Sequence, residues 1–182
     1  MAVSRVEQRL RRVSAALDGA GVAYAVIGGN AVAAWVGRVD PAATRTTKDV
    51  DLLVRRPDAG KVQAALEPLG FQRENLRDPV LFVDPDEPST KSGVHLVWAS
   101  ERIRPSYTVL SPDVTESERD PEGFVVIALP ALVRMKLTSF RDIDRVHIAD
   151  MLGVGLITPD VRGSLPLELL ARLEQVERSI EE

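Results

Sequence analysis

The sequence contains no cysteine and only two histidines, His95 and His147. Disulfides, thiolate metal sites and cysteine nucleophiles are therefore excluded, and so is a metal site built from several histidines. No apolar run approaches the roughly 18 residues that a membrane-spanning helix needs, and no signal peptide is recognisable at the start. These absences predict a soluble, cytoplasmic protein with no membrane partner.

Aromatic residues make up only 4% of the chain, and positive charge is not in excess, since the formal net charge is −4 over 182 residues. We therefore expect no general attraction to nucleic acid, although a local basic patch is compatible with this composition. The hydrophobic fraction of 45% and the charged fraction of 27% are typical of a globular domain. A chain of this length buries roughly 70% of its unfolded surface without cross-links.

Hydrophobic periodicity predicts how these residues are organised. Helices are expected at residues 3–19, 31–36, 58–69, 130–140, 142–152 and 165–179, and strands at residues 23–27, 49–54, 80–83, 93–98 and 124–127. Helices alternate with strands first and cluster at the end, which predicts an α/β (α+β) core, residues 1–129, covered by a C-terminal helical layer, residues 130–182. We expect the two parts to form a single structural domain.

The first strand runs directly into Gly28-Gly29-Asn30, and an alanine-rich helix that Asn30 could cap follows. Glycine lets another group approach the backbone closely. The start of a helix offers unpaired N–H groups and a partial positive charge, which suit a phosphate. A tight turn without a ligand is the alternative interpretation.

Asp49-Val50-Asp51 opens the second strand. Residues i and i+2 of a strand point to the same side, so the two carboxylates project together. Their mutual repulsion is relieved by a cation, and a hard divalent ion such as Mg²⁺, or Mn²⁺, also keeps positions open for phosphate oxygens. A polar strand at a sheet edge is the alternative.

Taken together, Gly28-Gly29, a helix and Asp49-x-Asp51 resemble the DNA polymerase β-like nucleotidyltransferase superfamily, whose hallmark is a Gly-Gly or Gly-Ser turn followed by an acid-x-acid strand. The segments IGGNAVAAW and RTTKDVDLLV look like small bacterial members related to the abortive-infection toxins of type IV toxin–antitoxin systems. Those proteins carry an Arg-x-Thr-x-Asp-x-Asp arrangement, which Arg45 and Thr47 complete here. Downstream, ALVRMKLTSFRDIDRVHIADML is similar to their Lys-Leu helix and charged helix, with Lys136 and Asp150 at the matching positions.

The resemblance implies a mixed central sheet of about five strands flanked by helices, and metal-dependent transfer of a nucleoside monophosphate from a nucleoside triphosphate (NTP). Asp49 and Asp51 would hold magnesium. The implied nucleotide-binding residues are Gly28, Gly29, Asn30, Arg45, Thr47 and Lys136. The acceptor could be an RNA, a protein or a small molecule, and a cognate antitoxin is a possible partner.

One departure from the superfamily pattern concerns the third carboxylate that active members usually carry on a later strand. His95 stands at that position. It could act as a general base beside Asp49 and Asp51, or it could mark a catalytically decayed nucleotide-binding or protein-interaction module. Asp84 and Glu101 are possible substitutes for the missing acid. An antibiotic-modifying enzyme of the same superfamily is a third reading.

Two further groups of residues have simpler interpretations. His147 lies three residues from both Asp144 and Asp150 on an expected helix, a spacing that allows pairing with them, so we expect its role to be structural. Arg102 and Arg104, with Tyr107, could contact RNA by charge and stacking.

Overall fold

One mixed sheet organises the chain, which a computed structural model describes over residues 4–74 and 77–181. The strand order is β3-β4-β5-β2-β1-β7-β6. The strands are β1 (Tyr24–Ile27), β2 (Val50–Val54), β3 (Gln72–Arg73), β4 (Val80–Val83), β5 (Val94–Trp98), β6 (Ser117–Arg119) and β7 (Val125–Ile127). β2 pairs in parallel with β5, and β1 in parallel with β7, while the other neighbours are antiparallel.

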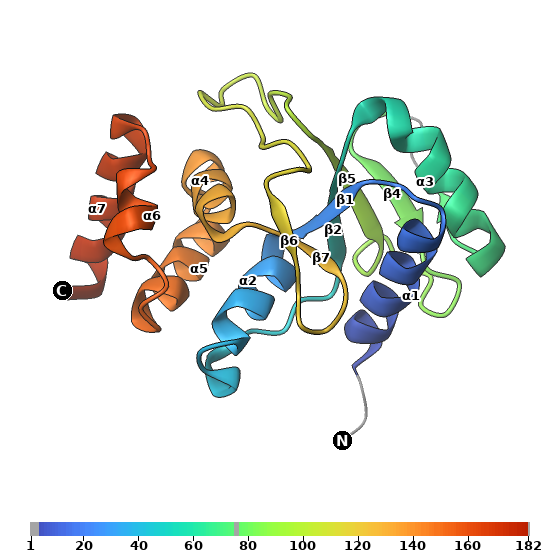
Figure 1. Cartoon of the computed structure of the whole chain (residues 1–182), viewed down its shortest axis with the longest axis horizontal. Coiled ribbons are helices and arrows are strands. Elements are labelled where there is room, and N and C mark those ends of the chain that lie inside the picture. The colour runs from blue at the N-terminus through green and yellow to red at the C-terminus, as the bar shows by residue number, and fades with distance from the viewer. Residues whose placement is uncertain (1–3, 75–76, 182) are drawn as a thin grey trace.

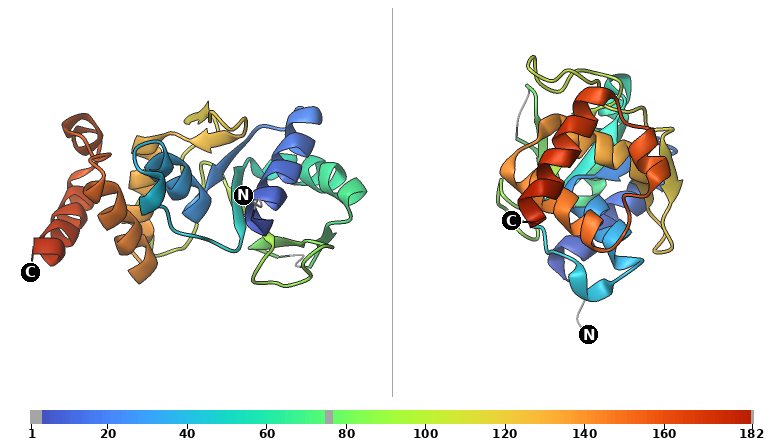
Figure 2. Two further views of the ribbon diagram at one scale, coloured as in Figure 1. Left: turned by 90° about the horizontal axis from the view of Figure 1, so that it is seen from below. Right: turned by 90° about the vertical axis from the view of Figure 1, so that its left-hand side faces the viewer.

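The helices form layers around this sheet. They are α1 (Arg5–Gly19), α2 (Gly28–Gly37), α3 (Ala59–Leu66), α4 (Leu129–Ser139), α5 (Asp142–Gly153), α6 (Pro159–Gly163) and α7 (Leu167–Glu181). α1 and α3 pack together on one side of the sheet, and α2, α4 and α5 lie on the other (Figure 1). α6 and α7 form the far end of the molecule, where α7 packs on α4 and α5 (Figure 2).

Strand register brings three chain segments together at one place. Ile27, the last residue of β1, lies opposite Asp51 of β2. Asp51 in turn lies opposite His95 of β5. Val50 and Leu52 on either side of Asp51 are fully buried, so the alternation of the strand turns Asp51 away from the core that they enter. The end of β1 and the beginnings of β2 and β5 are thus adjacent.

The expected mixed α/β fold is confirmed, with seven strands in place of about five. The two additional strands, β3 and β6, have two and three residues, are polar, and lie at the two edges of the sheet. Such strands carry no hydrophobic alternation that a sequence could reveal. The division at residue 129 stays a prediction, and α2 of the first part contacts both α4 and α5 of the second.

Two helices differ from expectation by three residues at one end, and the other expected helices differ by no more than two. α2 begins at Gly28, earlier than the expected residue 31, and Asn30 lies inside its first turn rather than capping it. The helix expected over residues 58–69 ends at Leu66 and continues as a short 3₁₀ turn, Glu67–Leu69, whose second residue is Pro68. Over the described residues, no helix is long and apolar enough to cross a membrane.

Arg9 of α1 is a buried charge that connects three segments. Its exposed fraction is 1%. Its guanidinium donates to Asp84 Oδ2, to Glu87 Oε2 and to the carbonyl oxygen of Lys48, each at 2.8 Å. α1 is therefore tied both to the loop after β4 and to the residue immediately before Asp49.

Replacing Arg9 by methionine is expected to lower the free energy of unfolding by about 3 kcal/mol, because it removes one of the two arginines that bind the buried carboxylate of Asp84 and leaves only Arg12 there. Arg11→Met on the same helix is the matched control. Arg11 is exposed and lies 3.6 Å from Glu122, so its loss is expected to cost at most about 1 kcal/mol. Urea unfolding measures both values, and equal losses of unfolding free energy would show that the three contacts of Arg9 do not stabilise the fold.

Candidate functional site

Asp49, Asp51 and His95 form one cluster at the adjacent strand ends. One ligand atom from each lies within 4.8 Å of the others. Nδ1 of His95 is 3.5 Å from Asp51 Oδ1 and 3.7 Å from Asp49 Oδ2. The structure therefore brings the two predicted acids together with His95, at the position where the resemblance predicts a third carboxylate.

Gly28 lies directly against the Asp51 carboxylate of this cluster. Its φ is +66°, a backbone conformation that favours glycine. A Cβ atom on Gly28 would lie 2.3 Å from Asp51 Oδ2 and 3.1 Å from Asp51 Cβ. The carboxylate of Asp51 can thus rest against the first turn of α2 only because residue 28 has no side chain. The predicted glycine turn and the predicted acids are in direct contact.

Two other predicted residues hold Asp49. Thr47 Oγ1 donates to Asp49 Oδ1 at 3.0 Å, and Asn30 Nδ2 donates to the carbonyl oxygen of Asp49 at 2.7 Å. A Cβ atom on Gly29 would lie 3.1 Å from Thr47 Cβ, so the loop packs closely on α2. Thr47 and Asn30 orient the acid, and their contact with a nucleotide stays a prediction.

The electrostatics of His95 follow from its two acidic neighbours. The carboxylate of Asp51, and more weakly that of Asp49, raise the pKa of His95 against the lowering effect of its burial. Nδ1 of His95 is buried and makes no hydrogen bond of good geometry within the described part of the chain. A buried polar atom without a partner, facing two carboxylates, is a site where a bound cation would complete the contacts.

The donor set fits a divalent metal ion. Asp49 and Asp51 supply the hard oxygen donors that magnesium and manganese prefer. The imidazole of His95 adds a nitrogen donor at the same place. The first turn of α2 next to it has N–H groups suited to an anion.

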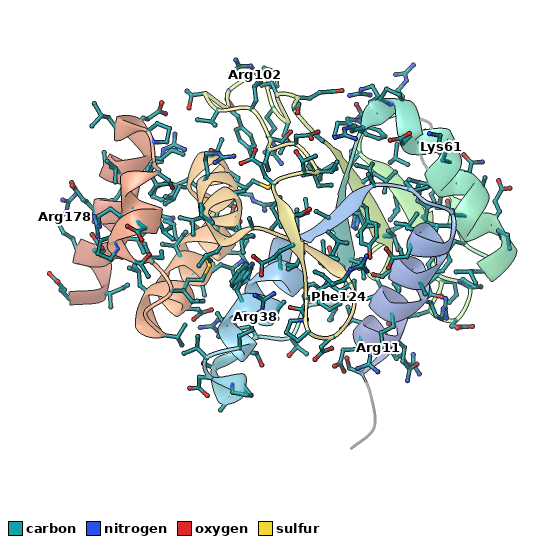
Figure 3. All side chains as sticks on the ribbon, viewed as in Figure 1. Arg11, Arg38, Lys61, Arg102, Phe124 and Arg178 are labelled. Atoms are coloured by element: carbon teal, nitrogen blue, oxygen red, sulfur yellow. The ribbon has the colours of Figure 1, made fainter. Side chains whose placement is uncertain are left out.

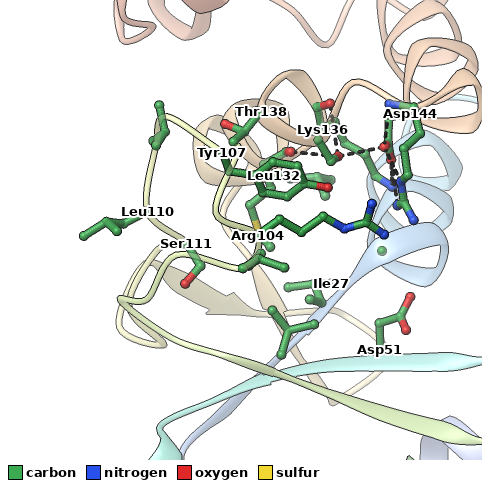
Figure 4. A pocket seen from close by; sticks show the side chains of 17 residues that line it. Ile27, Asp51, Arg104, Tyr107, Leu110, Ser111, Leu132, Lys136, Thr138 and Asp144 are labelled. Carbon is green, nitrogen blue, oxygen red and sulfur yellow. Dashed lines mark hydrogen bonds and ion pairs between the residues drawn. The ribbon is translucent and has the colours of Figure 1, made fainter. Parts of the chain in front are cut away.

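A cavity of about 190 Å³ adjoins the cluster. Ile27 and Asp51 line one side, α4 and α5 line the opposite side, and the loop that follows β5 covers it (Figure 4). Arg104 extends from this loop into the cavity, below Tyr107 in the view of Figure 4. Residues 100–122 carry no periodic signal, so the sequence indicated Arg104 as a possible RNA contact and not as a residue that lines this cavity.

Lys136 lines this cavity, as part of a buried ionic group. Its Nζ lies 2.9 Å from Asp144 Oδ1, and Arg141 Nε donates to Asp144 Oδ2 at 2.8 Å. Asp144 lies in the first turn of α5, where it also accepts the backbone N–H of Arg141. Burial alone would raise the pKa of Asp144, but Arg141 and Lys136 outweigh it and hold that pKa well below its usual range. Sequence reasoning identified Lys136 and missed Arg141 and the role of Asp144.

The remaining predicted residues are engaged elsewhere. Arg45 forms a bidentate pair with Asp150, at 2.6 and 3.0 Å, and does not line the cavity. Asp84 is bound by Arg9 and Arg12. Glu101 is bound by Arg56, so neither acid considered as a substitute for the third carboxylate joins the cluster.

His147 does not form the i,i+3 pairs with Asp144 and Asp150 that the sequence spacing allows, and its structural role stays a prediction. His147 is buried, and its Nδ1 has no hydrogen-bond partner among the described residues. Burial, followed by the nearby charge of Lys136, lowers the pKa of His147 to about 4. The two aspartates bind Lys136, Arg141 and Arg45 instead, because permanent cations compete better than a neutral imidazole.

Comparison with known proteins is consistent with this geometry. A family model described as aminoglycoside-2''-adenylyltransferase matches residues 9–101, just over half of the chain. This segment contains Gly28, Asp49, Asp51 and His95. No curated protein sequence matches the chain.

Solved structures share the fold. An antigenic nucleotidyltransferase-like protein from Paracoccidioides brasiliensis has a TM-score of 0.60 at 18% identity, over 97% of this chain and 90% of that one. The crystal structure of ANT(2")-Ia in complex with adenylyl-2"-tobramycin has a TM-score of 0.52 at 20% identity, over 99% and 100%. The solution structure of the antibiotic-resistance factor ANT(2'')-Ia also has a TM-score of 0.52, at 18% identity, over 99% and 86%. The predicted nucleotidyltransferase superfamily is supported, and a relation to abortive-infection toxins stays a prediction.

Gly28→Ala is expected to destabilise the chain more than Gly21→Ala. Both glycines have φ near +65°, at +66° and +65°, but a Cβ on Gly21 meets no atom within 4 Å. Gly21→Ala should cost roughly 1–2 kcal/mol of backbone strain. Gly28→Ala should cost about 1–3 kcal/mol more through overpacking against Asp51. Chemical denaturation of both variants checks this, and equal losses would show that Asp51 does not rest on Gly28.

The contribution of His147 to the stability of the chain is expected to fall as the pH decreases from 6.5 toward 4. The pKa of His147 is lowered to about 4 in the folded state, so between about pH 6.5 and pH 4 the unfolded state binds a proton at His147 that the folded state does not. Protonation in this window therefore favours the unfolded state, and the cost is absent above it. Asp144 stays ionised there, because its folded-state pKa lies below its unfolded value of 3.8. In His147→Phe the decrease between pH 7 and 4.5 should be smaller by on the order of 2 kcal/mol. Unfolding free energies of the wild-type chain and of His147→Phe at the two pH values measure this difference. The titration of His95 is common to both proteins and cancels in the comparison. Identical decreases in both proteins would show that His147 is not held neutral by burial.

Proposed function

We propose that this chain, which belongs to the aminoglycoside-2''-adenylyltransferase family of nucleotidyltransferases, transfers a nucleoside monophosphate from an NTP to an acceptor hydroxyl with the help of a divalent cation. The observation that carries the proposal is the cluster itself. Asp49, Asp51 and His95 present ligand atoms within 4.8 Å of one another, in contact with the glycine turn that opens α2. The proposed cation site at the two aspartates is therefore directly next to the proposed anion site at the start of α2.

The proposed roles follow from the contacts. The triphosphate lies along Gly28, Gly29 and Asn30, where the first-turn N–H groups of α2 have no partner within the helix. Asp49 and Asp51 hold the cation, for which we propose Mg²⁺ or Mn²⁺. When bound, such an ion neutralises negative charge on the phosphates. Thr47 orients Asp49 through its hydroxyl.

In the proposed transfer, the acceptor oxygen forms a bond to the α-phosphorus and the bond from this phosphorus to the bridging oxygen of the β-phosphate breaks. Diphosphate leaves, and the hydroxyl proton passes to Nε2 of His95, the base that we assign, since Nδ1 faces the two aspartates that hold the cation. Lys136, at the wall of the cavity, and Arg45 are proposed to contact the nucleotide with positive charge. Both side chains already bind a carboxylate, which fixes their positions.

A second candidate function is a nucleotide-binding or protein-interaction module that has lost catalysis. The replacement of the third carboxylate by His95 favours it, since Asp84 and Glu101 are bound by arginines. Such a module would bind Mg²⁺ and NTP without transferring a nucleotide. Retention of Mg²⁺–NTP binding with no labelled product from any acceptor would identify it.

The chemical class of the acceptor is a separate proposal. The family description and the tobramycin adduct of ANT(2")-Ia suggest an aminoglycoside, the antibiotic-modifying interpretation. An RNA end, a protein hydroxyl and another small molecule are the further proposals, and a cognate antitoxin is a proposed partner.

Asp49→Asn and Asp51→Asn are each expected to weaken Mg²⁺-dependent NTP binding and transfer about 100-fold or more, because each removes a charge that faces the cation. Calorimetry with each NTP, with and without EDTA, measures binding. Labelled NTPs with total RNA and with tobramycin measure transfer. Asp160→Asn, at an exposed position on α6, is the control. NTP binding that survives both EDTA and the two substitutions would overturn the proposal.

A further inference from the structure

A second cavity of about 270 Å³ continues from the first. The two cavities share Val97, Ile103 and Arg104 as lining residues. Pro79, Leu96 and Trp98 also line the second cavity, which therefore lies along the second half of β5, beside the beginning of β4. A molecule bound there would lie next to the proposed transfer site, on the β4 side of the sheet.

Both carboxylates that line this second cavity are already paired with an arginine. Asp78 and Glu101 both pair with Arg56, with oxygen–nitrogen distances of 3.0 and 2.6 Å. Trp98 Nε1 also donates to Asp78 Oδ1 at 2.6 Å. In the first cavity, Asp144 is bound by Lys136 and Arg141. Among the lining residues, only Asp51, the proposed metal ligand, is left without a lysine or arginine partner.

Arg102 and Arg104 show the opposite situation. In the described chain neither guanidinium has a carboxylate within 4.0 Å, since Arg102 donates to the carbonyl oxygen of Tyr107 and Arg104 lies 5.9 Å from the centre of the Tyr107 ring. Arg102 lines the second cavity alone, and Arg104 lines both. Arg102 lies at the outer edge of the covering loop, far from Arg178 of α7 (Figure 3).

We propose that the second cavity binds the acceptor through a phosphate group, held by Arg102 and Arg104. The inference rests on the proposed function and specifies its acceptor. A guanidinium presents paired N–H donors that match phosphate oxygens, and three arginines face two carboxylates here. An aminoglycoside carries several ammonium groups, which would meet unpaired arginines and find no free carboxylate. The acceptor is therefore a phosphate-bearing molecule with a neighbouring hydroxyl rather than a polyamine.

The test measures binding of three probes to the metal-free chain without NTP: a short single-stranded RNA, a sugar phosphate and tobramycin. We expect the RNA or the sugar phosphate to bind, and the tighter of the two identifies the source of the phosphate. Arg102→Gln should weaken this binding about tenfold, as expected for a charge-assisted hydrogen bond. Arg178→Gln is the matched control, because it removes one exposed arginine outside the cavity, and it should change binding less than twofold.

Three results would overturn the inference: tighter binding of tobramycin than of either phosphate probe, absence of binding by both phosphate probes, or equal effects of Arg102→Gln and Arg178→Gln. Mg²⁺–NTP binding by the wild-type chain is measured in parallel. If that binding is present while a phosphate probe is insensitive to Arg102, only the acceptor assignment fails. If Mg²⁺–NTP binding is itself absent, the proposed function fails.

Discussion

The contact between the Asp51 carboxylate and the α-carbon of Gly28 is the constraint on which the site depends. Antiparallel pairing of β1 and β2 sets Asp51 opposite Ile27, and the next residue must turn into α2 without a side chain. The acids thereby lie against the positive end of a helix, where phosphate is favoured. Parallel pairing of β2 with β5 then adds His95. Backbone register thus assembles groups that are 67 residues apart in sequence, from Gly28 to His95.

The surroundings fix the charges on either side of this contact. Arg9 ties α1 to the residue before Asp49, so the beginning of β2 is anchored from the core side. On the cavity side, Asp144 pairs with Lys136 and Arg141. Asp78 and Glu101 both pair with Arg56. Asp51 lines the first cavity without a lysine or arginine partner, and Arg102 and Arg104 of the covering loop have no carboxylate partner among the described residues. This distribution suits a cation at the former and an anionic group at the latter.

Local signals in the sequence were sufficient for part of this arrangement. The hydrophobic alternation of the strands and the period of the helices predicted an α/β fold, because both are local properties. That the glycine turn, the two acids and His95 would meet was implied by the resemblance to nucleotidyltransferases. The edge strands β3 and β6 were missed, since two or three polar residues carry no period. The partners of Asp144, His147 and Arg45 were also missed. They depend on how α4, α5 and the loop before β2 pack, and spacing along one helix cannot decide between competing cations.

Crystallography of the chain with Mn²⁺ and a non-hydrolysable NTP tests the central claim most directly, because manganese is located by its anomalous scattering. The account predicts one anomalous peak bonded to Asp49 and Asp51, with phosphate oxygens over Gly28 and Gly29. A nucleotide bound elsewhere, or manganese absent from the two aspartates while the nucleotide is present, would contradict it.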